Sequence, residues 1–267
     1  MHDAGSADGT DDGDRTDSDR TGGANIGALV GAVGGAGTTR CTLEAAAALA
    51  ADGADVGVFD AAYATQGLAD HLDGRIEPDL TALVTDAADA PLSDALTTLD
   101  CEAPGRVSVC PAFAPLERFA RAKAPDAARR FEARLNRASE RFDHVLVDVP
   151  PVAANQAIAA VNAADRVVVV APGTTRGADA VQRTRTRLEH VGSGADFVVA
   201  TRGAFEAADC EVPASEVTDP ASVPSCLDEG GPFAESVARL AAGATGRDVS
   251  EAAGSGGLLS GVERYVK

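Results

Sequence analysis

Short runs of β-branched residues alternate along this chain with alanine-rich segments, and this alternation restricts the fold more than any other feature. The pattern is typical of βαβ units and of a mostly parallel sheet. Two of the runs, at 145–149 (VLVDV) and 166–171 (RVVVVA), are apolar without alternation, as expected of strands covered by helices on both faces. The sequence therefore predicts an α/β fold in which helices flank both faces of a mostly parallel sheet.

The predicted elements can be placed along the chain. Strands are expected at 26–33, 55–59, 106–110, 144–149, 166–171 and 196–200, and helices at 39–51, 126–141, 155–162, 177–191 and 232–242. Right-handed crossovers place the loops that follow parallel strands along one edge of the sheet, where ligands of open α/β folds bind. Candidate functional residues are therefore sought at the C-terminal ends of the strands.

The two ends of the chain differ from its body. Residues 1–24 carry seven aspartates and no large apolar side chain after Met1, so burial cannot offset the entropy cost of ordering them. We expect an acidic disordered tail at 1–24, one domain at 25–246 and a flexible tail at 247–267. The last ten residues form a short amphipathic segment, which we expect to pack on the body or on a partner. Membrane binding is not expected, because so short a segment with few basic groups would bind weakly.

The charge composition indicates a protein adapted to high salt concentration. The formal net charge is -18, and only Lys123 and Lys267 are lysine. An acidic, lysine-poor surface is typical of halophilic proteins, because molar salt screens its self-repulsion.

The five cysteines are far apart and form no CxxC pair, so they are interpreted as buried thiols. No stretch has the length and apolarity of a membrane span or a signal peptide, and a cytoplasmic location is expected.

A glycine-rich loop follows the first predicted strand and leads directly into a predicted helix. It reads Gly34-Gly35-Ala36-Gly37-Thr38-Thr39-Arg40. Glycines allow successive backbone N–H groups to turn inward as an anion-binding nest, and a helix N-terminus adds the positive end of its dipole. An ordinary glycine-rich turn is the alternative. The order of strand, glycines and a helix opening with Thr-Thr favours a phosphate site.

This loop resembles the deviant Walker A loop of the ParA/MinD ATPases, which reads Lys-Gly-Gly-x-Gly-Lys-Thr followed by Thr or Ser. The similarity extends over residues 26 to about 245. Segment 59–62 resembles the Asp-x-Asp segment of the family, and 142–151 resembles its Walker B strand. Segment 198–202 stands where the family has its adenine-side Asn-Arg. The resemblance implies a P-loop NTPase fold of the ParA/MinD type.

The resemblance also implies roles for particular residues. Nucleotide would be bound by Gly34, Gly35, Ala36, Gly37, Thr38, Thr39, Arg40, Thr201, Arg202 and Pro213. Thr39 and Asp148 would hold Mg²⁺, and Asp60 would be the candidate catalytic carboxylate. The implied ligands are ATP or another nucleotide together with Mg²⁺, and the implied assembly is a homodimer.

Four positions depart from the family pattern. Both family lysines are absent, since Val33 and Thr38 occupy their places; Ala62 replaces the second aspartate of Asp-x-Asp, and Thr201 replaces the asparagine. Losing one charge-stabilising donor typically lowers the rate about 100- to 1000-fold, so hydrolysis is expected to be weak or absent. Arg40 either replaces the lost charge or is an ordinary solvated arginine.

Three functions remain open at this point. The leading one is a ParA/MinD-like nucleotide-binding protein that acts as a dimerising switch or scaffold in intracellular positioning or partitioning. The second is a pseudo-ATPase, an interaction module that no longer binds nucleotide. The third is an enzyme of the wider family, such as an amidotransferase-type synthetase.

A row of arginines raises a separate hypothesis. Arg130, Arg134, Arg137 and Arg141 follow helical spacing beside a core stripe, and similar patches in the family hold DNA non-specifically through its phosphates. A solvated, salt-bridged helix face explains the same row, and we prefer that explanation.

Overall fold

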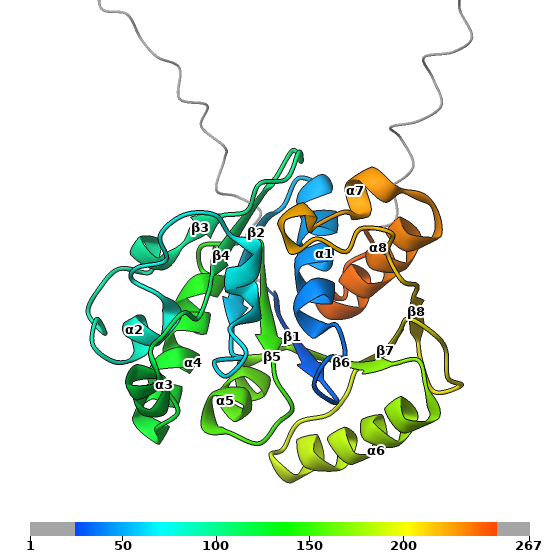
Figure 1. Ribbon diagram of the computed structural model, residues 1–267. Coiled ribbons are helices and arrows are strands. Elements are labelled where there is room, and N and C mark those ends of the chain that lie inside the picture. Colours follow the sequence, from blue (N-terminus) through cyan, green and yellow to red (C-terminus); the bar gives the residue numbers. More distant parts are fainter. Residues whose placement is uncertain (1–24, 250–267) are drawn as a thin grey trace, which may run out of the picture.

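The computed structural model describes residues 25–249, which form an eight-stranded sheet between two layers of helices (Figure 1). The strands are β1 (Asn25–Gly31), β2 (Asp55–Asp60), β3 (Thr97–Thr98), β4 (Arg106–Cys110), β5 (His144–Val149), β6 (Arg166–Pro172), β7 (Phe197–Thr201) and β8 (Cys210–Val212). Their order is β3-β4-β2-β5-β1-β6-β7-β8. All neighbouring strands are parallel except the antiparallel pair β3–β4.

The helices divide between the two faces of the sheet. One face carries α1 (Thr38–Ala51), α7 (Cys226–Glu229) and α8 (Gly231–Thr245); the other carries α2 (Leu80–Val84), α3 (Leu116–Ala122), α4 (Pro125–Ser139), α5 (Asn155–Ala163) and α6 (Thr175–His190). Short 3₁₀ turns lie at Gly67–His71, Leu92–Ala95 and Pro220–Ser222. Helix α1 packs along α8, and α4 packs along α5.

Each face of the sheet has its own hydrophobic core. Alternate residues of β6 enter opposite cores: Val167 and Val169 pack beneath α4, α5 and α6, whereas Val168 and Val170 pack beneath α1 and α8. Every residue of β5 is buried. This two-sided burial is why these two strands are apolar without alternation, and it confirms the predicted fold class.

The predicted elements are all present, with boundaries within three residues of those expected from the sequence. The short elements β3, β8, α2, α3 and α7 were not among the predicted strands and helices. They contain two to seven residues, too few for a periodic pattern, and their stability depends on contacts with the rest of the fold.

The predicted end of the domain, at 246, lies within the described residues. Val249 is buried in the core beneath α1 and α8, so the body continues past the predicted boundary at 246. The predictions for 1–24 and for the terminal amphipathic segment lie outside the described residues.

Within 25–249, no helix is both long and apolar enough to cross a membrane. All five cysteines are free; four are buried, as predicted, and Cys101 is partly exposed.

Candidate functional site

The glycine-rich loop connects the C-terminal end of β1 to the first turn of α1. Gly35 and Gly37 have φ angles of 73° and 88°, in the left-handed region that glycine adopts without strain. No N–H group from Gly34 to Gly37 donates to another described residue, and a Cβ added at Gly34 or Gly35 would meet no atom within 4 Å. The loop is therefore an open cradle of free amides at a helix N-terminus, which suits an anion.

A hydroxyl and a carboxylate meet at the inner end of this loop. The Thr39 hydroxyl donates a hydrogen bond of 2.6 Å to Oδ2 of Asp148, which lies on β5. The Asp148 side chain is almost fully buried. Burial raises its pKa to about 6, and the hydrogen bond from Thr39 opposes that rise. Two oxygen ligands of this kind fit Mg²⁺, which prefers hydroxyl, carboxylate and water oxygens.

Asp60 lies beside this pair, opposite Asp148 in the register of β2 and β5. It is fully buried, and its carboxylate accepts hydrogen bonds from the backbone N–H groups of Ala62 (2.7 Å) and Ala112 (3.3 Å). Burial, followed by the charge of Asp148, raises the pKa of Asp60 well above its usual range. Asp60 therefore ties together the loops after β2 and β4, and its catalytic role stays a prediction.

The two positions of the absent lysines have different surroundings. Val33 is partly buried and packs against both hydrophobic cores. The Thr38 side chain lies against the end of β1, since a Cβ added at Gly31 would come within 2.7 Å of its hydroxyl oxygen. Lys123, the one lysine among the described residues, lies at the end of α3 with its ammonium over the ring of Phe119. No described lysine therefore serves the loop.

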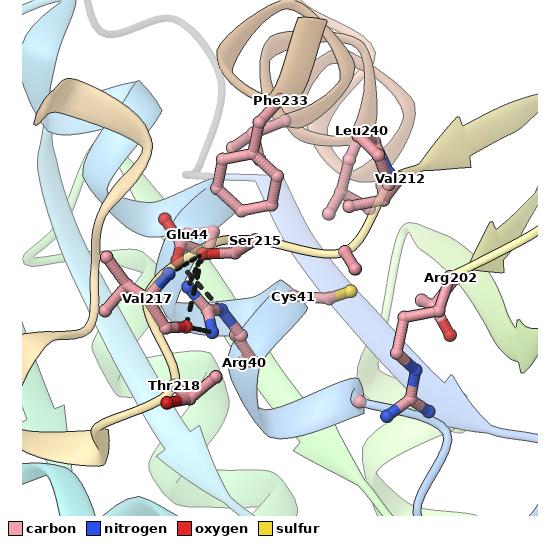
Figure 2. A pocket seen from close by; sticks show the side chains of 15 residues that line it. Arg40, Cys41, Glu44, Arg202, Val212, Ser215, Val217, Thr218, Phe233 and Leu240 are labelled. Atoms are coloured by element: carbon pink, nitrogen blue, oxygen red, sulfur yellow. Dashed lines mark hydrogen bonds and ion pairs between the residues drawn. The ribbon is translucent and has the colours of Figure 1, made fainter. Parts of the chain in front are cut away.

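A cavity of about 320 Å³ opens beside the loop, between α1, the ends of β7 and β8, and α8 (Figure 2). Its wall is largely apolar and includes Val212, Val217, Phe233 and Leu240. Five of the residues predicted to bind nucleotide line it: Gly37, Arg40, Thr201, Arg202 and Pro213. An apolar cavity next to an anion cradle suits a ligand that joins an apolar ring to a charged group.

Arg40 enters this cavity but turns away from the loop. Its guanidinium donates to the hydroxyls of Ser215 (2.6 Å) and Ser225 (2.8 Å), to the backbone carbonyl of Val217 and to the Glu44 carboxylate (3.2 Å). Figure 2 shows the Arg40 side chain beside Ser215 and Val217, which belong to the segment that follows β8, and beside Glu44 of α1. The Arg40 charge is therefore used to hold this segment against α1, and the idea that it replaces a lysine at the loop has no support in this geometry.

The partners of Arg40 were not predicted from the sequence. Glu44 is buried and accepts hydrogen bonds from the backbone N–H groups of Ser225 and Cys226 as well as from Arg40. Its position four residues after Arg40 was the only available signal, because such pairs face each other on a helix. Nothing local in the sequence indicates that residues 215–229 complete the cluster.

Two residues at the end of β7 bind the backbone of the glycine-rich loop. The Thr201 hydroxyl donates to the backbone carbonyl of Ala36 (2.7 Å), and the Arg202 guanidinium donates to that of Gly35 (2.6 Å). Both residues were predicted on the adenine side of the site. They contact the backbone of the phosphate loop and also line the cavity, so their place on the adenine side stays a prediction.

Three arginines of the predicted row, Arg130, Arg137 and Arg141, are exposed, and the fourth is not. Arg134 is buried, with 5% of its surface exposed, and donates to the Ala88 carbonyl at 2.6 Å. Arg130 donates to the carbonyl of Val84 at the end of α2. The Arg134 guanidinium therefore caps a carbonyl inside the protein, while DNA contact through the other three arginines and the solvated helix face that we preferred both stay predictions.

Comparisons with known proteins identify the architecture. No protein-family model and no curated protein matches the sequence. Among solved structures, the septum site-determining protein MinD of Pyrococcus horikoshii, complexed with Mg-ADP, is similar with a TM-score of 0.70 and 19% identity, covering 86% of this chain and 98% of that one. This chain has the fold of the MinD and ParA ATPases.

Two further solved structures support that statement. A ParA-family ATPase from Chlorobium tepidum has a TM-score of 0.66 and 13% identity, covering 81% of this chain and 98% of that one. A complex of a Cyanothece McdA variant with ATP has a TM-score of 0.52 and 23% identity, covering 78% of this chain and 80% of that one. The fold expected from the resemblance to ParA/MinD P-loop NTPases is confirmed, and the chemistry depends on the residues described above.

Proposed function

We propose that this chain is a ParA/MinD-like nucleotide-binding protein that acts as a dimerising switch or scaffold in intracellular positioning. It binds ATP or another nucleotide weakly with Mg²⁺ and hydrolyses it slowly or not at all. The observation that carries the proposal is the open cradle of free amides at Gly34–Gly37, which adjoins both the Thr39–Asp148 pair and an apolar cavity.

The residues present fit a magnesium nucleotide. The cradle and the N-terminus of α1 suit the phosphates, the Thr39 hydroxyl and the Asp148 carboxylate suit the metal and its water shell, and the apolar wall suits a base. Bound Mg²⁺ would supply positive charge to the phosphate oxygens. Gly67 leaves room at the metal position, because a Cβ there would lie 3.1 Å from the Thr39 hydroxyl.

The absence of both lysines determines how strongly we expect the protein to bind nucleotide. Each cation lost from a phosphate site removes charge-assisted hydrogen bonds, so we expect binding at least about tenfold weaker than in a lysine-bearing relative, or about 1.4 kcal/mol. Hydrolysis suffers more than binding, because it depends on charge stabilisation in the transition state. A switch that assembles with nucleotide and is reset when the nucleotide dissociates tolerates both losses.

The test is a calorimetric titration of the purified protein with Mg-ATP in molar KCl. We expect millimolar or tighter binding that requires Mg²⁺ and is weakened in Asp148→Asn, which keeps the shape of the side chain and removes its charge. Light scattering of the same samples should show the fraction of dimer rising with Mg-ATP.

The competing function is the pseudo-ATPase interaction module. The packing of the partly buried Val33 against both cores favours it, because an apolar residue at this position neutralises no phosphate charge. Calorimetry without any heat at millimolar Mg-ATP would establish this alternative and exclude our proposal. A synthetase of the wider family would instead need a substrate site beyond the cavity, and no described residue indicates one.

A further inference from the structure

Arg40, the arginine that follows the phosphate loop in the sequence, does not supply positive charge to that loop. Two cations line the cavity, Arg40 and Arg202. Arg40 donates to four different residues of α1 and of the segment after β8. Arg202 makes one side-chain hydrogen bond, to the Gly35 carbonyl, and pairs with no carboxylate in residues 25–249. A guanidinium has five N–H donors, so most of those of Arg202 remain free beside the loop.

The hydrogen bond of Arg202 fixes the orientation of a loop amide. In a planar trans peptide unit, the carbonyl and the following N–H point in opposite directions. A donor that holds the Gly35 carbonyl toward Arg202 therefore turns the Ala36 N–H away from Arg202. The Thr201 hydroxyl does the same through the Ala36 carbonyl, and this directs the Gly37 N–H away from Thr201. Two adjacent residues of β7 and its turn thus orient two successive amides of the cradle.

The backbone around Arg202 holds its side chain in this position. Arg202 has a φ of 56°, in the left-handed region, which costs a non-glycine residue about 1–2 kcal/mol. Its N–H donates to the Val212 carbonyl at 2.9 Å. The following residue, Gly203, presses against Gly173, where an added Cβ would come within 1.9 Å of the Gly203 backbone. Such strain persists where the surroundings impose it, and it is concentrated at functional sites.

We propose that Arg202 is the positioning residue of the phosphate loop: it holds the Gly35 carbonyl outward, turns the Ala36 amide toward the phosphates, and places its positive charge beside a site without lysine. This inference rests on the proposed function, since it names the group that supports polyphosphate binding at the same site. In Figure 2 the Arg202 side chain extends toward the loop, apart from the cluster around Arg40.

The test separates phosphate binding from base binding. Affinities of the full-length protein for Mg-ATP, magnesium pyrophosphate and adenosine are measured by calorimetry at one KCl concentration. The proteins are the wild type, Arg202→Gln, Arg202→Lys and the control Arg176→Gln. Arg176 is exposed on α6 and has no ion pair among the described residues, so this control removes one positive charge from the surface.

We expect Arg202→Gln to weaken Mg-ATP and pyrophosphate binding about tenfold and to leave adenosine binding and the melting temperature unchanged. Arg202→Lys should recover part of the loss, because it restores the charge without the planar fork. Unchanged Mg-ATP affinity in Arg202→Gln would overturn the inference while leaving the proposed function intact. An equal loss for adenosine would also overturn it, since a general structural effect does not select phosphate. A wild type that binds none of the three ligands would refute the proposed function and the inference with it.

Discussion

Replacing Arg40 with methionine should destabilise the protein, because the Arg40 guanidinium joins α1 to the segment that closes one side of the cavity. The substitution keeps the apolar stem, whose guanidinium end lies 5.7 Å from the Phe233 ring, and removes the charge and its hydrogen bonds. Glu44, only 2% exposed at the side chain, then loses its cationic partner.

The expected loss of stability depends on how far the Arg40 and Glu44 side chains are buried. Breaking a fully buried ion pair by removing one partner costs about 3–5 kcal/mol. The Arg40 side chain is 27% exposed, so solvent weakens the interaction. Glu44 also keeps the donors of Ser225 and Cys226. We therefore expect a loss of about 2 kcal/mol in the free energy of unfolding, which lowers the melting temperature by roughly 4–8 °C in a domain of this size.

Denaturant and thermal unfolding at fixed KCl measure this change in wild type, Arg40→Met, Arg40→Lys and the surface control Arg176→Met. Arg40→Lys should lose about half as much, because one ammonium cannot reach the hydroxyls, the carbonyl and the carboxylate together. If Arg40→Met and Arg176→Met both stay within about 0.5 kcal/mol of wild type, the cluster does not hold the segment and our account of Arg40 is refuted.

Two other predictions concern salt and pH. With a net charge of -18, the melting temperature should rise steeply from dilute to molar KCl as repulsion is screened; a flat profile would remove the halophile interpretation. His144 is 4% exposed, and burial, followed by the charge of Arg247, lowers its pKa below 6.5. The unfolded histidine therefore binds a proton first as the pH falls, so this contribution to stability is complete above about pH 6.5 and decreases below it. The difference in unfolding free energy between wild type and His144→Gln should accordingly shift against wild type between pH 7.5 and 5.5, and a pH-independent difference would contradict the assignment.

The sequence predicted the parts of the fold that depend on local pattern. The apolar runs of β5 and β6 identified central strands because both faces of each strand are buried. The loop at 34–40 identified the candidate site because its glycines and the helix behind it are contiguous. Contacts between distant segments could not be predicted in this way. Arg40 meets Ser215 and Ser225, which lie 175 and 185 residues away, in a region without a helical or strand period.

The position of the α4 arginines relative to the core stripe was also not enough to predict which of them is buried. Arg134 follows the same helical spacing as the exposed Arg137 and Arg141, and its burial depends on a carbonyl 46 residues earlier, at Ala88. The role of Arg202 could not be seen for the same reason: Gly35, whose carbonyl it holds, lies 167 residues before it.

The central claim is that the cradle for a nucleotide is preserved and that only its charge has been lost. The most direct measurement is the Mg-ATP affinity and phosphate release of Thr38→Lys, compared with wild type, with the Thr38→Lys/Asp148→Ala double variant, and with Thr186→Lys, which adds the same charge at an exposed position on α6. The account predicts that Thr38→Lys binds Mg-ATP about tenfold or more tightly than wild type and releases phosphate faster. Thr186→Lys should change neither quantity, and the gain should disappear in the double variant. A Thr38→Lys protein that folds normally and behaves as wild type would contradict the claim, because the fold would then have been kept without its phosphate chemistry.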